Sequence, residues 1–118
     1  IVSFEKLEAA RYASYLKADG KIIVNSQEID PMPVITGAMD YPHDALDALA
    51  AKGVDIDCID ALSMALKSGS SKAVNIVLIG RLSKYLGISE DKWLAAIAET
   101  VKPKFVELNK SAFVAGRN

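Results

Sequence analysis

The chain has 118 residues, of which 51% are hydrophobic and 25% are charged, a composition typical of a globular domain rather than a disordered protein. A net charge of −1 gives no overall attraction to nucleic acid or to an anionic membrane, and no apolar run approaches the roughly 18–20 residues that a membrane helix needs. The single cysteine excludes an intrachain disulfide and a cysteine cluster that could hold zinc or an iron–sulfur centre. With no signal peptide in view, we expect a cytoplasmic location.

The first 25 residues predict a strand, a helix and a second strand. Ile1 and Val2 are β-branched residues that suit the end of a strand, and Ser3 is suited to cap a helix that Gly20 ends. The run KIIVN, residues 21–25, is apolar and bounded by turn residues, so it predicts a buried strand. Two strands joined through a helix should run parallel. Because a native domain seldom begins at the end of a strand, we expect the chain to be truncated there.

The next stretch predicts a loop followed by a short helix. Pro31 and Pro33 should hold the chain extended, since proline fixes φ and lacks the N–H that a sheet requires. Asp44 is expected to cap a helix that Gly53 ends.

Residues 54–58 predict a third strand with one solvated face. Their side chains alternate between an apolar face, with Val54, Ile56 and Cys58, and an acidic face, with Asp55 and Asp57. Such alternation is typical of a strand at or near the edge of a sheet.

The second half of the chain predicts helices throughout. Asp60 is expected to cap the first of them, which should end near Gly69. The run AVNIVLIG, residues 73–80, could be a strand, but apolar residues keep helical spacing beyond Gly80 and favour a buried helix. Ser89 should cap a further helix. Residue 103, a proline, separates that helix from a last one, which Gly116 is expected to end.

These elements indicate an α/β fold. We expect an incomplete doubly wound, mainly parallel sheet, with about three strands in this chain and a helical carboxyl-terminal half. A complete doubly wound sheet would need further strands, which we expect upstream of Ile1.

No group of residues has the spacing of a catalytic, cofactor-binding or metal site, and we assign none to this chain. His43 is the only histidine, and a lone loop histidine is usually solvated. Cys58 lies on the apolar face of its strand without a nearby base, which favours a packed, inert thiol. Asp55, Asp57 and Asp60 could suggest a cation site, but alternating acids more often form a solvated face. No glycine-rich phosphate loop follows either intact strand.

Two asparagines interrupt apolar helix faces. We expect Asn75 and Asn109 to be buried and fully hydrogen-bonded, tying helices to neighbouring backbone rather than contacting a partner or ligand.

Charge is divided unevenly along the chain. Residues 1–60 hold 5 Lys+Arg against 11 Asp+Glu, and residues 61–118 hold 9 against 4. We interpret the positive half as solubility charge rather than as a surface that steers an acidic partner.

Two stretches resemble a known family. The segment SFEKLEAARYASYLKADGKIIVNSQEIDPMPV, continued by DYP at 40–42, resembles the small (beta) subunit of indolepyruvate ferredoxin oxidoreductase. The carboxyl-terminal half is similar to the gamma domain of 2-oxoacid:ferredoxin oxidoreductases. That second pattern consists of Asn75, Leu78, Gly80, Asn109, Ala112, Phe113 and Gly116. The resemblance makes residues 1–118 the carboxyl-terminal part of a single gamma-type domain, whose amino-terminal glycine-rich segment is absent from this sequence.

The resemblance also implies a function. The family enzyme oxidatively decarboxylates arylpyruvates to aryl-acetyl-coenzyme A and passes the electrons to ferredoxin. Thiamine diphosphate, magnesium and iron–sulfur clusters belong to its large subunit, so this chain would hold none of them and be inactive alone. The implied partners are the large catalytic subunit and, indirectly, ferredoxin.

Two other functions stay open. One is the equivalent gamma subunit of a pyruvate or 2-oxoglutarate enzyme, and the other is a free-standing α/β regulatory module. A truncated sheet would also leave an open edge, so we expect the fragment to self-associate.

Overall fold

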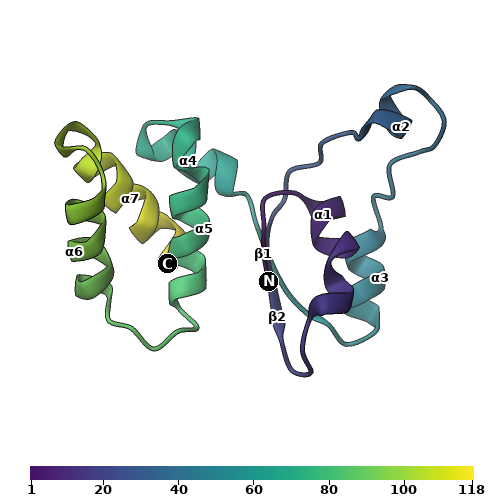
Figure 1. Ribbon diagram of the computed structural model, residues 1–118, viewed down its shortest axis with the longest axis horizontal. Coiled ribbons are helices and arrows are strands. Elements are labelled where there is room, and N and C mark those ends of the chain that lie inside the picture. The colour runs from purple at the N-terminus through teal and green to yellow at the C-terminus, as the bar shows by residue number, and fades with distance from the viewer. The chain divides into compact units, whose positions relative to one another are not determined.

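The computed structural model describes all 118 residues, which form two compact units, Ile1–Ile59 and Asp60–Asn118 (Figure 1). The first unit combines a parallel sheet with helices, and the second consists of helices alone. The expected α/β class, with about three strands and a helical second half, is therefore confirmed. No helix of the chain combines the length and apolar character needed to span a bilayer.

The sheet of the first unit has three parallel strands in the order β1 (Val2–Ser3), β2 (Lys21–Asn25) and β3 (Asp55–Ile59). The central strand β2 pairs on both sides, and its last four residues are buried, as its apolar sequence predicts. The edge strand β3 begins one residue later than predicted, and its buried position is Ile59.

Helices α1 (Lys6–Arg11) and α3 (Ala45–Ala51) pack against this sheet. The core between them is formed by Ala9, Ile22, Val24 and Leu46. The helix predicted to run to Gly20 is shorter, since α1 ends at Arg11 and a single 3₁₀ turn (Ala13–Tyr15) follows. Within these two elements only Ala9 is fully buried.

The prediction that Ser3 caps the first helix is wrong. Ser3 continues the strand, where it lies opposite Val24, so the helix begins later. The N-cap is Glu5, whose carboxylate accepts a hydrogen bond from the Glu8 amide at 2.9 Å.

The predicted extended loop contains the short helix α2 (Met32–Ile35), so the expectation for Pro33 is also wrong. Pro33 lies in the first turn, where the N–H that proline lacks has no partner within the helix. Asp44 and Gly53 bracket α3 as predicted, although the Asp44 side chain makes no capping hydrogen bond.

The second unit contains α4 (Ala61–Ser68), α5 (Val74–Ser83), α6 (Glu90–Thr100) and α7 (Val106–Arg117), with 3₁₀ turns at Ser71–Ala73 and Pro103–Phe105. All four predicted helices are confirmed, including the helical reading of residues 73–80. Asp60 caps α4 through Ser63, and Gly69 ends it in a left-handed conformation. Ser89 occupies the N-cap position of α6 without a side-chain hydrogen bond.

Helices α5 and α7 approach so closely that only glycine fits at two positions. A Cβ atom on Gly80 would lie 2.1 Å from the Phe113 carbonyl oxygen, and one on Gly116 would lie 1.9 Å from the Val77 carbonyl oxygen. The prediction that Gly116 ends the last helix is therefore wrong. Gly116 lies within α7, which continues to Arg117. Around this crossing, Val77 and Phe113 are completely buried.

This geometry predicts that Gly80→Ala destabilises the second unit. Alanine normally stabilises a helix interior by about 1 kcal/mol relative to glycine. Here the added methyl group must push two backbones apart, and overpacking of this kind costs about 1–3 kcal/mol in free energy of unfolding. Fluorescence of Trp93, the only tryptophan, should report the earlier transition in urea, because its ring lies 5.8 Å from that of Phe113.

The matched control is Asn75→Ala, an exposed position on the same helix. It should leave the urea midpoint unchanged or raise it, since alanine is the better helix former. A Gly80→Ala variant as stable as this control would contradict the close-crossing explanation.

Candidate functional site

The candidate site is the carboxyl-terminal edge of the parallel sheet, the place where open α/β sheets usually bind ligands. Polar residues that follow β1 and β2 meet there with residues of the loop before α3. They are Glu5, Lys6, Glu28, Tyr41 and His43. Both ligand binding and loop anchoring could require such a cluster, so the partners of each group decide between them.

Glu5 and Tyr41 form the buried centre of this edge, each with only 6% of its surface exposed. The Tyr41 hydroxyl donates a short hydrogen bond to Glu5 Oε1, which also accepts from the Ile29 amide at 3.1 Å. Glu5 Oε2 accepts from the Glu8 amide, and the Leu7 amide donates to the Tyr41 oxygen at 3.1 Å. The two side chains therefore have their hydrogen-bonding capacity taken up within the protein.

The pKa values of this pair lie away from neutrality. Burial alone would raise the pKa of Glu5, but the hydrogen bonds from Tyr41 and the backbone amides outweigh it and hold that pKa below its usual range. Burial, together with the bond to Glu5, raises the pKa of Tyr41. Since proton transfer is most effective when the pKa is near the working pH, this pair is suited to anchoring rather than acid–base catalysis.

Glu28 forms the outer, more exposed part of the edge. Its two carboxylate oxygens contact Lys6 Nζ at 3.1 Å and His43 Nδ1 at 2.7 Å. The hydrogen bond between Lys6 and Glu28 raises the pKa of Lys6 and lowers that of Glu28. His43 is thus a largely exposed residue engaged by a carboxylate, consistent with the expected solvated loop histidine.

A shallow hollow beside this edge brings His43 and Cys58 onto one surface. It is lined by Lys6, His43, Leu46, Asp47, Ala50, Ile56 and Cys58. The expectation of a packed thiol is wrong, because Cys58 is exposed on the edge strand while Ile59 is the buried position. Although the residue as a whole is exposed, partial burial of the thiol raises the pKa of Cys58, which disfavours the nucleophilic thiolate.

The aspartates considered for a cation site have other partners. Asp55 pairs with Lys21 Nζ at 2.5 Å, and Asp60 accepts hydrogen bonds from the Ser63 amide and hydroxyl. No group of three or more His, Cys, Asp or Glu side chains has the arrangement of a metal site.

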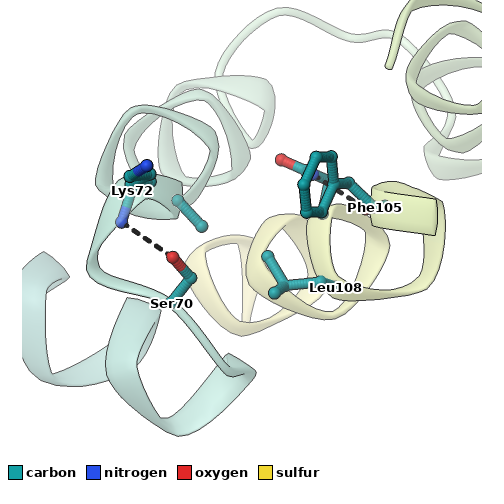
Figure 2. A pocket seen from close by; sticks show the side chains of 6 residues that line it. Ser70, Lys72, Phe105 and Leu108 are labelled. Carbon is teal, nitrogen blue, oxygen red and sulfur yellow. Dashed lines mark hydrogen bonds between the residues drawn. The ribbon is translucent and has the colours of Figure 1, made fainter. Parts of the chain in front are cut away.

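The second unit has a small apolar hollow of its own, shown in Figure 2. It is lined by Ser70, Lys72, Ala73, Phe105, Leu108 and Asn109. Asn109 is only half-buried, so the prediction that it is buried is wrong, but its amide donates to the Phe105 carbonyl at 2.8 Å, which confirms the predicted bond to backbone. Asn75 is exposed on α5, and the prediction that it is buried is wrong because the buried face of that helix carries Val77 and Leu78.

Glu5 and Tyr41, the best-connected polar groups of the sheet edge, were not predicted as site residues. Glu5 had no predicted role beyond its place in the first predicted helix. No local pattern could pair it with Tyr41, because the two residues are 36 positions apart. The only signal available was the turn Asp40-Tyr41-Pro42, which belongs to the stretch that resembles the family.

Comparison with known proteins gives a consistent family. The family model described as pyruvate ferredoxin/flavodoxin oxidoreductase matches residues 1–118. A protein of Thermococcus kodakarensis named indolepyruvate oxidoreductase subunit IorB is 36% identical over 98% of this chain and 60% of its own length. A protein of the same name from Archaeoglobus fulgidus is 33% identical, over 100% of this chain and 61% of its own length.

A solved structure shares the fold. The gamma subunit of a keto/oxoacid ferredoxin oxidoreductase from Geobacter sulfurreducens superimposes with a TM-score of 0.69 at 19% identity, covering 98% of this chain and 60% of that one. The chain thus spans about 60% of the length of the proteins that it matches.

The anchoring interpretation predicts that Tyr41→Phe destabilises the first unit. Glu5 would lose its hydroxyl donor and the Leu7 amide its acceptor, and a hydrogen bond to a charged group contributes about 1.5–3 kcal/mol. In NMR experiments, the amide protons of Leu7, Glu8 and Ile29 should exchange faster with solvent, by the factor that this loss of free energy implies.

The effect should depend on pH in a defined direction. Because the folded pKa of Glu5 is lowered, its stabilisation is complete above the unfolded carboxyl pKa of about 4.3 and is lost as the pH falls below it. The difference between wild type and Tyr41→Phe should therefore shrink on acidification below that value. Tyr12→Phe, the same change at an exposed tyrosine, is the control and should have no effect at any pH.

Proposed function

The chain belongs to the pyruvate ferredoxin/flavodoxin oxidoreductase family, and we propose that it forms part of the small, non-catalytic subunit of an indolepyruvate ferredoxin oxidoreductase. The observation that carries the proposal is the 36% identity, over 98% of this chain, to the Thermococcus kodakarensis subunit named IorB. The fit of the fold to a solved gamma subunit is consistent with it.

The proposed enzyme joins an arylpyruvate to coenzyme A with loss of carbon dioxide. The products are the aryl-acetyl-coenzyme A thioester, carbon dioxide and one proton from the coenzyme A thiol, and two electrons pass to ferredoxin. We propose that this chain contributes a scaffold rather than reacting groups. Its buried carboxylate, Glu5, already accepts hydrogen bonds from Tyr41 and from backbone amides.

The cofactors of such an enzyme are proposed to lie in the larger subunit. Protein iron–sulfur clusters are usually held by four cysteines, and this chain has one. A magnesium–diphosphate site needs free carboxylates, whereas Asp55 and Asp60 are paired within the protein. On this basis we propose that the residues of this chain hold neither thiamine diphosphate with its magnesium ion nor a cluster. No catalytic step is assigned to them.

The proposed partner is the large catalytic subunit, with ferredoxin engaged indirectly through it. The names of the relatives support this proposal, because each is described as a subunit of an oxidoreductase.

A second candidate is the equivalent gamma subunit of an enzyme that acts on pyruvate or another 2-oxoacid. The description of the matching family, which names pyruvate, favours it. The two candidates differ in substrate and share the role of the chain, so substrate preference separates them.

The proposal predicts activity only for the assembled complex. The full-length subunit, co-produced with the large subunit of the same organism, should reduce ferredoxin with indolepyruvate and coenzyme A, followed by ferredoxin absorbance under anaerobic conditions. Residues 1–118 alone should be colourless and should not turn over indolepyruvate.

Pyruvate and 2-oxoglutarate, tested at the same concentration, are the comparison. A faster reaction with either would support the second candidate instead. Stoichiometric iron in purified residues 1–118, or binding of thiamine diphosphate measured by calorimetry, would contradict the assignment of the cofactors to the partner.

A further inference from the structure

The segment between β2 and α3 exposes an unusual amount of apolar surface. We define the arm as residues 29–40, which carry α2 at the tip of a long loop (Figure 1). Four large apolar side chains along it are more than half exposed: Ile29 at 56%, Met32 at 68%, Ile35 at 65% and Met39 at 53%. Single exposed apolar residues are ordinary, but four within one short segment form a patch that needs explanation.

The arm is ordered by its own backbone hydrogen bonds. The Thr36 amide donates to the Met32 carbonyl at 2.9 Å, and the Pro33 carbonyl accepts from both Ala38 at 2.9 Å and Met39 at 3.2 Å. Gly37 makes this tight turn possible, because its φ of 77° is a conformation that glycine adopts readily and residues with a side chain rarely do. The exposed apolar side chains are therefore carried by a hydrogen-bonded turn rather than by an irregular loop.

The sheet edge fixes the base of the arm. Glu5, itself buried, accepts the Ile29 amide at 3.1 Å where the arm begins, and it binds Tyr41 directly after the arm ends. Glu28 is bound by Lys6 and His43 at the same place. A surface fixed in advance loses less conformational entropy on binding, which favours a role in association.

Charge around the arm restricts its partner. Residues 22–51 contain five acidic residues and no lysine or arginine. Asp30 and Asp40 lie at the two ends of the arm. In a symmetric contact between two arms, the aspartates of one arm would approach the aspartates of the other. Like charges that meet at an interface are unfavourable. Anionic membranes and nucleic acids are disfavoured for the same reason.

We propose that the arm is the element by which this subunit docks onto the larger subunit, with Met32 and Ile35 seated in an apolar groove rimmed by lysine or arginine. This inference rests on the proposed function, which supplies the larger subunit as partner. Short helices with apolar anchors commonly bind in grooves of this kind, and a few such anchors provide most of the binding energy.

The test uses the full-length subunit and the separately purified large subunit, with the dissociation constant measured by calorimetry. The double variant Met32→Ser/Ile35→Ser should weaken binding at least about tenfold, the minimum typical of a hot-spot pair. The matched control, Tyr12→Ser/Tyr15→Ser, removes two exposed aromatic residues of the same unit outside the arm and should bind like wild type.

Charge reversal provides an independent readout. Asp30→Lys/Asp40→Lys should slow association and flatten its dependence on salt, because favourable long-range attraction to the rim would be lost. Thermal melting of each variant should match wild type, since the altered side chains are exposed. A change in melting would be followed by single substitutions at Met32 and Ile35.

The outcomes separate this inference from the proposed function. Wild-type affinity in the Met32→Ser/Ile35→Ser variant would overturn the inference and leave the proposed function intact. Failure of the wild-type subunit to bind the large subunit would overturn both. If light scattering showed that the arm variants abolish self-association instead, the occupant would be a second copy and the proposal would be wrong.

Discussion

A buried carboxylate imposes the main constraint on the first unit. An unpaired charge in the interior is costly, so Glu5 is compatible with burial only while donors surround it. Those donors come from separate parts of the chain: the Glu8 amide in α1, the Ile29 amide after β2 and the Tyr41 hydroxyl before α3. One side chain thereby fixes the start of the helix, the exit of the central strand and the return of the loop.

The second unit is organised by a steric constraint rather than an electrostatic one. Helices α5 and α7 pack backbone against backbone at Gly80 and Gly116, where no side chain fits. The close approach positions Phe113 in full burial and lets Arg117 reach the Ser83 hydroxyl at 2.5 Å. Two glycines of the resemblance pattern are thus explained by packing, without a ligand.

The two constraints are in keeping with the proposed role of a subunit that supports chemistry located elsewhere. At the sheet edge, where an α/β protein would bind a ligand, the buried polar groups are already satisfied by the protein itself. The same network holds the base of the arm, whose tip exposes apolar side chains. Polar residues that could have formed a pocket are instead bonded to one another and to the backbone at the base of the arm.

The elements whose signals are local could be predicted from the amino-acid sequence. The apolar run at residues 21–25 predicted the central strand, and the capping position of Asp60 and helical periodicity predicted the helices of the second unit. Helix periodicity and turn residues act within a few positions, so they can be read from neighbouring letters. The strand–helix–strand order of the first half and the helices of the second half together predicted the α/β fold class, which the structure bears out.

The roles of particular residues depend instead on tertiary contacts. Ser3 has the chemistry of a cap, but pairing with β2 keeps it in a strand and leaves the cap to Glu5. Gly116 has the identity of a helix stop, but its role is set by Val77 on another helix. Such outcomes depend on contacts between residues more than 20 positions apart. The local sequence around one residue carries no information on which distant residue will contact it.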